Sequence, residues 1–392
     1  MNPEQATQDS SRLLYDRNLH IIFSVTLMAV MGVASITPAF PKIIKELNIS
    51  PRSIGWLITA FTVPGVFLTP ILGVLADRFG RKRVLAPSLF LFALAGGACA
   101  LIQDFQLLLI LRFFQGAGAA ALPAINVALI GDLYTGSERD TAMGYNTSVL
   151  SLGVAGYPAI GGLLAAAGWH YPFFLPLIAL PVGLFVLFAL NNPEPKNNRP
   201  LKGYLGNIRQ AVQQREVAVL FLASLVTFII LYGSYLTYFP LLLSQTFQAS
   251  TSIIGLIMSG MACTMAVTSS QMGRLAKYYT KKQLIMAAYV LYAVALFLVP
   301  FVPNIPLLLF PVFLFGVAQG LNIPSVQTML VALAPLEYRA SFMAVNGTIL
   351  RLGQTLGPLL MGIFFMLWGT DGAFFAGVGC ALFMLATLGL LL

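Results

Sequence analysis

Ionisable side chains are scarce in this chain, and the densest group of them lies between Gly73 and Arg83, in the sequence GVLADRFGRKR. Asp77 is the one carboxylate of this stretch. A carboxylate in such a position can contact the positive amino end of a neighbouring helix. The basic residues beside it also fix the side of a membrane on which the stretch lies. The group therefore predicts electrostatic contacts between helices.

Two further arginines, Arg112 and Arg351, lie inside long apolar runs. A charged side chain at the middle of a membrane helix costs about 2.5–3.5 kcal/mol on insertion scales, so such a residue is a candidate functional residue. Arg112 is close to the start of its run, and its side chain could instead extend to the nearby interface. Arg351 lies deeper in its run, where that alternative fits less well.

Acidic residues and histidines lie at the ends of the apolar runs, and none lies deep within one. His20 and His170 are both at run ends. The three cysteines, Cys99, Cys263 and Cys380, lie within apolar runs and lack the spacing of a metal or redox motif. We therefore expect neither an enzyme nor a metal or other cofactor.

The composition indicates which kind of helix positions these residues. Of the 392 residues 58% are hydrophobic and only 9% are charged. A soluble domain of this size cannot have such a surface. Apolar runs of about 20 residues, each long enough to cross a membrane as a helix, recur along the chain. We predict an all-α integral membrane protein with twelve spans: Ile21–Phe40, Ile54–Ala76, Val84–Ile102, Leu107–Ile130, Thr141–Ala167, Pro172–Leu190, Val217–Pro240, Ile253–Leu275, Leu284–Val302, Leu307–Ala332, Phe342–Leu367 and Ala373–Leu392.

Lysine and arginine are concentrated in the loops on the same side as the amino terminus. The opposite loops hold only Lys42, Lys45 and Arg52. The positive-inside rule then predicts that both termini are cytoplasmic in a plasma (inner) membrane. It also accounts for the net charge of +9, so we expect a lipid bilayer and no nucleic acid as a partner.

The chain divides near its middle at a long polar connection. We predict four segments: a cytoplasmic tail at 1–19, a six-span half at 20–190, a cytoplasmic linker at 191–216 and a second six-span half at 217–392. Apolar residues between Tyr204 and Val212 share one helical face. This spacing predicts a short helix that lies on the membrane surface.

The two halves match when the chain is shifted by 200 residues against itself. The matches include glycine, proline, arginine and asparagine in one register: Gly73 with Gly273, Gly116 with Gly316, Arg139 with Arg339, Asn146 with Asn346, Gly153 with Gly353, Pro158 with Pro358 and Gly162 with Gly362. Parallel repeats with a site between them are typical of transporters.

Three motifs in this framework resemble signatures of the major facilitator superfamily. The stretch from Gly73 to Arg83 resembles its signature between spans 2 and 3, and RFFQGAGAA from Arg112 resembles the fourth-span signature of its drug:proton antiporter branch. The fifth span resembles a second antiporter signature at Gly144, Gly153, Pro158, Gly161 and Gly162. The resemblance covers essentially the whole chain. It implies twelve helices in two pseudo-symmetric halves, and a transporter that usually works as a monomer.

The resemblance also implies a conformational latch. Asp77 would contact the amino end of span 11 in the outward-facing state, and Asp132 would pair with Arg81. The latch residues are Gly73, Asp77, Arg78, Gly80, Arg81 and Asp132. The second half departs from this pattern because Lys277 stands where the first half has Asp77, so we expect the latch in the first half only.

Arg112 would belong to proton coupling or to the electrostatics of the cavity. If the protein is coupled to protons, Asp77 and Asp132 with Arg81 are the remaining candidates for carrying them. Tyr157 departs from the antiporter signature, which has glycine before the proline. Its ring could narrow a helix contact or project into the cavity.

The central cavity of this fold is lined chiefly by spans 1, 4, 7 and 10. The candidate lining residues are Met28, Met31, Gln115, Asn126, Asn146, Tyr157, Tyr232, Tyr235, Tyr238, Gln319, Asn322, Asn346 and Gln354. Tyr232, Tyr235 and Tyr238 recur at every third position, which predicts one helical face. Methionine and aromatic linings suit varied amphipathic ligands, although each residue could also serve in packing.

We therefore expect proton-coupled efflux of small amphipathic or drug-like compounds. One alternative is transport of an organic anion or anionic lipid through Arg112 and Arg351, not necessarily coupled to protons. A non-transporting membrane sensor is an alternative of another class. The expected partners are a small-molecule substrate, protons and the lipid bilayer.

Overall fold

The computed structural model describes residues 13, 15–191, 214–334 and 339–392. Most of the predicted tail and the predicted linker helix between Tyr204 and Val212 lie outside the described residues. The described part of the chain is helical almost throughout and contains no strand. The prediction of an all-α fold is confirmed.

The first half is a series of long apolar helices joined by short turns. Its elements are α2 (Arg17–Ala34), η1 (Thr37–Ala39), α3 (Phe40–Glu46), η2 (Pro51–Ser53), α4 (Gly55–Phe79), α5 (Arg81–Cys99), α6 (Phe105–Ala119), α7 (Leu122–Leu133), α8 (Gly136–Ala167), η3 (Tyr171–Ile178) and α9 (Ala179–Ala189). Successive elements such as α6 and α7 together form one span.

The second half follows the same plan. Its elements are α11 (Arg215–Ile230), the π-helix η4 (Leu231–Tyr238), α12 (Phe239–Phe247), α13 (Thr251–Ser270), α14 (Met272–Leu275), α15 (Lys281–Leu298), η5 (Val299–Phe301), α16 (Ile305–Leu333) and α17 (Arg339–Leu391). Non-helical backbone at Trp368 and Gly369 divides α17 into a first arm (339–367) and a second arm (370–391).

The polar residues between the apolar runs determine where the helices begin. Asp104 accepts a hydrogen bond from the backbone N–H of Leu107 and so caps α6. Thr280 and Gln283 form a reciprocal capping box at the start of α15. Gly80 separates α4 from α5 with φ of 101°, a conformation that strongly favours glycine.

The described chain contains eleven helical segments long and apolar enough to cross a membrane. The last of them includes both arms of α17, so the expected twelve spans are confirmed. Large apolar side chains are exposed along the outside of the bundle, for example Phe67, Phe188 and Phe310. A surface of this kind faces lipid, as in a multi-pass membrane protein.

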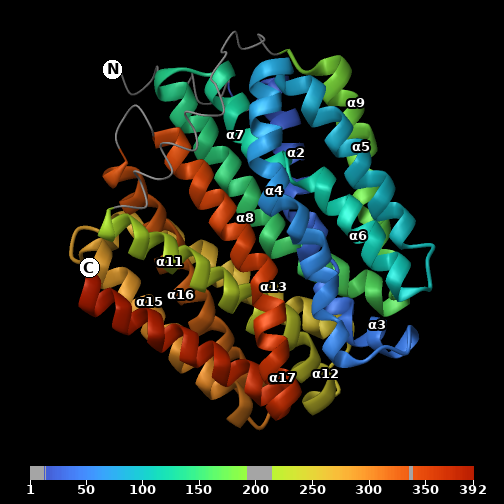
Figure 1. Cartoon of the computed structure of the whole chain (residues 1–392), viewed down its shortest axis with the longest axis vertical. Helices are drawn as coiled ribbons and strands as arrows, with labels where there is room; N and C mark the ends of the chain where they lie inside the picture. Colours follow the sequence, from blue (N-terminus) through green and yellow to red (C-terminus); the bar gives the residue numbers. More distant parts are fainter. Residues whose placement is uncertain (1–12, 14, 192–213, 335–338) are drawn as a thin grey trace.

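Two helix pairs join the first half to the second. α8 packs against α13, and α4 packs against the first arm of α17. In Figure 1 the first arm of α17 (orange) runs beside α4 (blue) across the middle of the molecule. These four helices are the second and fifth spans of each half, so the sequence repeat is also a repeat in space.

The crossings between the halves use equivalent residues of the repeat. A Cβ atom added at Gly55 of α4 would lie 3.1 Å from Cβ of Pro358 in α17. The equivalent Gly255 of α13 packs against the carbonyl group of Pro158 in α8. Close approach of this kind requires small residues, because any side chain would separate the helices.

The halves are close together on one side of the membrane and apart on the other. We call the side at which α4 ends and α5 begins the basic side. Near it, a Cβ atom added at Gly73 of α4, Gly144 of α8 or Gly347 of α17 would meet no atom within 4 Å, and the same holds for Gly273 of α14, which directly follows α13. On the opposite side Gly162 is packed tightly against Thr251. The bundle is therefore closed on the opposite side and open on the basic side.

Candidate functional site

Three predicted latch residues form an ion-pair cluster on the basic side. Arg81 donates a hydrogen bond from Nε to Oδ2 of Asp132 over 3.1 Å, and its Nη1 forms an ion pair with Asp77. The three residues come from α4, α5 and α7, and the sharp turn at Gly80 brings Arg81 back toward Asp77. Arg78 lies apart from them, over the ring of Phe79. One guanidinium group therefore holds two carboxylates within the first half.

The predicted contact between Asp77 and span 11 is absent from the contacts of the described residues, in which Asp77 pairs with Arg81 alone. Gly73, another predicted latch residue, also lacks a partner helix, since a Cβ atom added there would meet no atom within 4 Å. Both differences follow from the separation of α4 and α17 on the basic side. The resemblance placed the latch in the outward-facing state, and the structure has the basic side open.

Tyr134, directly after α7, ties the same end of the first half to the start of α2. Its hydroxyl donates a hydrogen bond to Oδ2 of Asp16 over 2.6 Å. Burial and this hydrogen bond raise the pKa of Tyr134 well above its usual value, so the hydroxyl group stays protonated.

Arg112 is completely buried inside the first half. Its Nη1 donates hydrogen bonds to the carbonyl oxygen of Gly32 (2.9 Å) and to Oε1 of Gln115 (2.7 Å), and its Nε donates to the carbonyl oxygen of Leu57 (3.1 Å). The guanidinium carbon lies 4.3 Å from the ring centre of Phe61. Arg112 therefore joins α2, α4 and α6, and its side chain faces no open space.

Arg351 differs because it is only half-buried and lies between the two halves. Its aliphatic carbons pack beside Gly65 of α4, at 3.1 Å from the position of an added Cβ atom. Its Nη1 donates a hydrogen bond to Oε1 of Gln354 over 3.1 Å. Neither ion pair of the described residues involves Arg351. It is therefore a positive charge in mid-span with no acidic partner in the described part of the chain.

Several predicted cavity residues instead form buried polar networks inside each half. In the first half Asn126 of α7 donates a hydrogen bond to Thr26 of α2, which donates one to Asn146 of α8. In the second half Asn322 of α16 donates one to Thr227 of α11 over 2.6 Å. The same pair of residue types thus links the first and fourth spans of both halves.

The three tyrosines of span 7 do not share one face. They lie in the π-helix η4, whose wider turn separates side chains that are three positions apart. Tyr235 stacks between Phe239 and Phe315 in the core of the second half, and Tyr238 stacks on Phe365. Only Tyr232 is partly exposed. The prediction of one face fails because it assumed the turn of an α-helix.

The other predicted lining residues are buried within the helix bundle. The buried ones are Met28, Met31, Gln115, Asn126, Asn146, Tyr157, Gln319, Asn322, Asn346 and Gln354. Tyr157 packs beside Gly153 in α8. Gln319 is completely buried, and its amide nitrogen and oxygen have no hydrogen-bond partner among the described residues.

The predicted antiporter glycines serve the closed side. Gly161 packs against the carbonyl oxygen of Ser35 at the end of α2, and Gly162 against Thr251 and Gly255 at the start of α13. Gly153, further along α8, lies against Leu27 of α2. Gly144, near the basic side, has no such contact.

Sequence reasoning missed the hydroxyl groups that join the halves on the closed side. Thr59 of α4 donates a hydrogen bond to the carbonyl oxygen of Thr355 over 3.2 Å. Ser259 of α13 accepts one from the backbone N–H of Ala159 over 3.0 Å. The signal was available, since Thr59 and Ser259 occupy the same position of the repeat.

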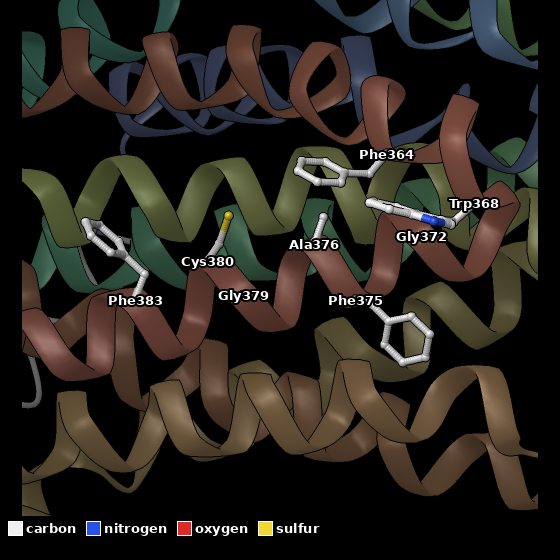
Figure 2. A pocket seen from close by; sticks show the side chains of 8 residues that line it. All are labelled: Phe364, Trp368, Gly372, Phe375, Ala376, Gly379, Cys380 and Phe383. Atoms are coloured by element: carbon white, nitrogen blue, oxygen red, sulfur yellow. The ribbon is translucent and has the colours of Figure 1, made fainter.

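One pocket lies away from all of these residues, between the two arms of α17. Figure 2 shows its lining, in which Phe364 and Trp368 lie close to each other at one end and Phe383 at the other. Phe364 and Trp368 stack with ring centres 5.9 Å apart. Its exposed aromatic side chains face outward, where lipid would lie, so it is separate from the predicted central cavity.

Two related six-helix halves that meet closely on one side only are the architecture of a membrane transporter. The chain belongs to the Major Facilitator Superfamily, whose family model matches residues 22–246 and 220–392. The predicted family and the prediction of a transporter, not an enzyme, are confirmed.

Two relatives with similar sequences are named for drug resistance. Multidrug resistance protein 1 of Bacillus subtilis (strain 168) is 27% identical over 353 residues, covering 88% of this chain and 89% of that protein. The quinolone resistance protein NorA of Staphylococcus aureus (strain COL) is 21% identical over 353 residues. This match covers 89% of this chain and 90% of NorA.

A solved structure shares the fold. It is a bacterial homologue of the human lysosomal transporter Spinster, in an inward-facing and occupied conformation, with a TM-score of 0.81 and 16% identity. The match covers 95% of both chains. The organisation in two halves is therefore common to proteins with very different sequences.

Proposed function

We propose that this protein exports small amphipathic, drug-like compounds by alternating access. The observation that carries the proposal is the asymmetry between the two sides, with tight glycine crossings on one and separated helices on the other. A site between the halves would then be open to one side at a time, as transport requires. The names of the multidrug and quinolone resistance relatives support this class of substrate.

The basic side is proposed to face the cytoplasm, because lysine and arginine concentrate in its loops. The structure then represents the inward-facing state, and both termini lie in the cytoplasm. We propose that the protein is located in the plasma membrane and works as a monomer. In this state a compound in the cytoplasm or the inner leaflet reaches the space between the halves.

Coupling to protons is proposed to act through Asp77 and Asp132, which share Arg81. Protonation of either carboxylate removes its charge and weakens its bond to the guanidinium group. Protonated Asp77 cannot make the latch contact, whereas charged Asp77 can pass from Arg81 to the amino end of α17, where the helix dipole favours a negative charge. The latch would then close the basic side.

The test is transport of ethidium into inside-out membrane vesicles. We expect uptake that depends on the protein and on a pH gradient, and that stops when the gradient is dissipated. Uptake that continues unchanged without the gradient would remove proton coupling from the proposal. A protein that carries no amphipathic compound in reconstituted liposomes would instead fit the non-transporting sensor.

A further inference from the structure

The second half carries an unneutralised positive charge at the boundary between the halves. Arg351 lies in the middle of the first arm of α17, beside Gly65 of α4. The hydrogen bonds that it donates among the described residues end at Gln354, which leaves Nε and Nη2 available. No acidic residue lies deep within any predicted span, so the chain offers no obvious counter-ion at this depth.

The contrast with Arg112 shows that this charge is not required for packing in the same way. Arg112 donates three hydrogen bonds, has an aromatic ring over its face and is fully buried, although its Nη2 has no hydrogen-bond partner among the described residues. Arg351 has one side-chain acceptor and remains partly exposed. An arginine of this kind costs free energy within a membrane unless an anion accompanies it.

We propose that Arg351 binds the anionic group of an amphipathic organic anion, such as a carboxylate, sulfonate or phosphate. The planar guanidinium group can donate two parallel hydrogen bonds to two oxygens of such a group. The positive charge of Arg351 attracts an anion and repels a cation. Poor hydration at this depth strengthens both effects. The inference rests on the proposed export function and adds the charge of a preferred substrate.

The surroundings of Arg351 suit the apolar part of such a molecule. Tyr232 of η4 lies close enough to interact with the charge of Arg351, and its ring is partly exposed and stacks on Phe228. Thr355 donates a hydrogen bond to Thr62 of α4 over 3.0 Å one helical turn away, so the site is adjacent to a contact between the halves. A bound anion would therefore lie where α4 and α17 separate.

The binding test uses the purified full chain in phosphatidylcholine nanodiscs, with fluorescein as the organic anion and ethidium as the cation. We expect Arg351→Gln to weaken fluorescein binding at least about tenfold, as for loss of a hydrogen bond to a charged group, and to leave ethidium binding unchanged or tighter. Arg351→Lys should retain part of the affinity. The matched control is Arg139→Gln, which removes the same charge from an exposed position on the basic side.

A second variant keeps the test decisive if Arg351→Gln does not fold. Gln354→Glu places a carboxylate beside Arg351 and should compete with fluorescein, again without loss of ethidium binding. Unchanged fluorescein affinity in both variants, equal loss of both probes, or no fluorescein binding by the unaltered protein would overturn the proposal. The export function is tested separately by ethidium transport. If the unaltered protein transports ethidium, the export function holds even when one of these binding results overturns the role of Arg351.

A second arm identifies the source of the anion. Phosphatidylglycerol in the nanodiscs should displace fluorescein from the unaltered protein if the site takes anionic lipid, and have no effect if it takes free organic anions. In both cases the fluorescein affinity of Arg351→Gln should be the same with and without phosphatidylglycerol in the nanodiscs. If phosphatidylglycerol displaces fluorescein from Arg351→Gln as strongly as from the unaltered protein, the lipid binds at another site. That result would count against the proposal.

Discussion

At the scale of single residues, the two arginines within the spans have different structural roles. Arg112 donates a hydrogen bond to Gly32, whose carbonyl group lies in the last turn of α2 and lacks a helical donor there. A positive charge at the carboxyl end of a helix is favourable. Arg112 thus holds α2, α4 and α6 together, whereas Arg351 lies at the boundary between the halves.

The first prediction follows from this difference. Arg112→Met should lower the thermal unfolding temperature of the purified protein, because each acceptor left unpaired costs about 1–3 kcal/mol. Arg351→Gln, at a half-buried position with one side-chain partner, should lower it much less. The measurement is thermal unfolding of both variants in the same detergent, and an equal loss would contradict the structural role of Arg112.

The second prediction concerns the carboxylate that only the first half possesses. Asp77→Asn removes an ion-pair partner of Arg81 and the charge needed for the proposed latch. We expect reduced ethidium transport with little loss of membrane insertion. The matched control is Lys277→Asn at the equivalent position of the repeat, which should change transport little. Equal transport by the two variants at equal abundance would mean that there is no latch at Asp77.

At the scale of helices, the closed side is sealed by equivalent elements of the two halves. Gly55 crosses Pro358 and Gly255 crosses Pro158, and a hydroxyl group one turn further along each glycine's helix adds a hydrogen bond. A single hydrogen bond is worth about 0.5–1.5 kcal/mol, which is enough to shift the balance of two states several-fold. Thr59 and Ser259 therefore favour the state that is closed on this side.

The third prediction tests these hydroxyl groups. Thr59→Val with Ser259→Ala should shift the protein toward the state that is closed on the basic side. A cysteine placed at Gly73, in a background without native cysteines, should then react more slowly with a maleimide reagent, since this position would be covered. Thr147→Val is the control, because Thr147 bonds only within its own helix. Unchanged labelling in the double variant would contradict a role in the closed side.

At the scale of the whole molecule, the repeat and the distribution of charge define two sides. Both helix pairs that join the halves, α4 with α17 and α8 with α13, are in contact near the opposite side. At the basic side α4, α8 and α17 carry open glycine positions, as does α14, which directly follows α13. One rocking motion about the middle of the membrane could exchange these arrangements, as expected for parallel repeats.

The fourth prediction tests which side is cytoplasmic. In a background without native cysteines, Arg52→Cys should react with a membrane-impermeant maleimide added to intact cells, because Arg52 is exposed in the η2 turn on the opposite side. Arg139→Cys, exposed on the basic side, should react only after the cells are permeabilised. The reverse pattern would invert the proposed topology and the direction in which the open side faces.

The sequence by itself determined the twelve spans, the repeat and the cluster of charge after α4, because hydropathy and loop charge are local properties. Only the tertiary structure decided which arginine is buried, which hydroxyl groups join the halves and where the three tyrosines point. These features depend on helix rotation, on the π-helical turn at η4 and on the separation of α4 from α17 on the basic side. Side chains that are equivalent in a hydropathy pattern thus differ in their partners once the helices pack.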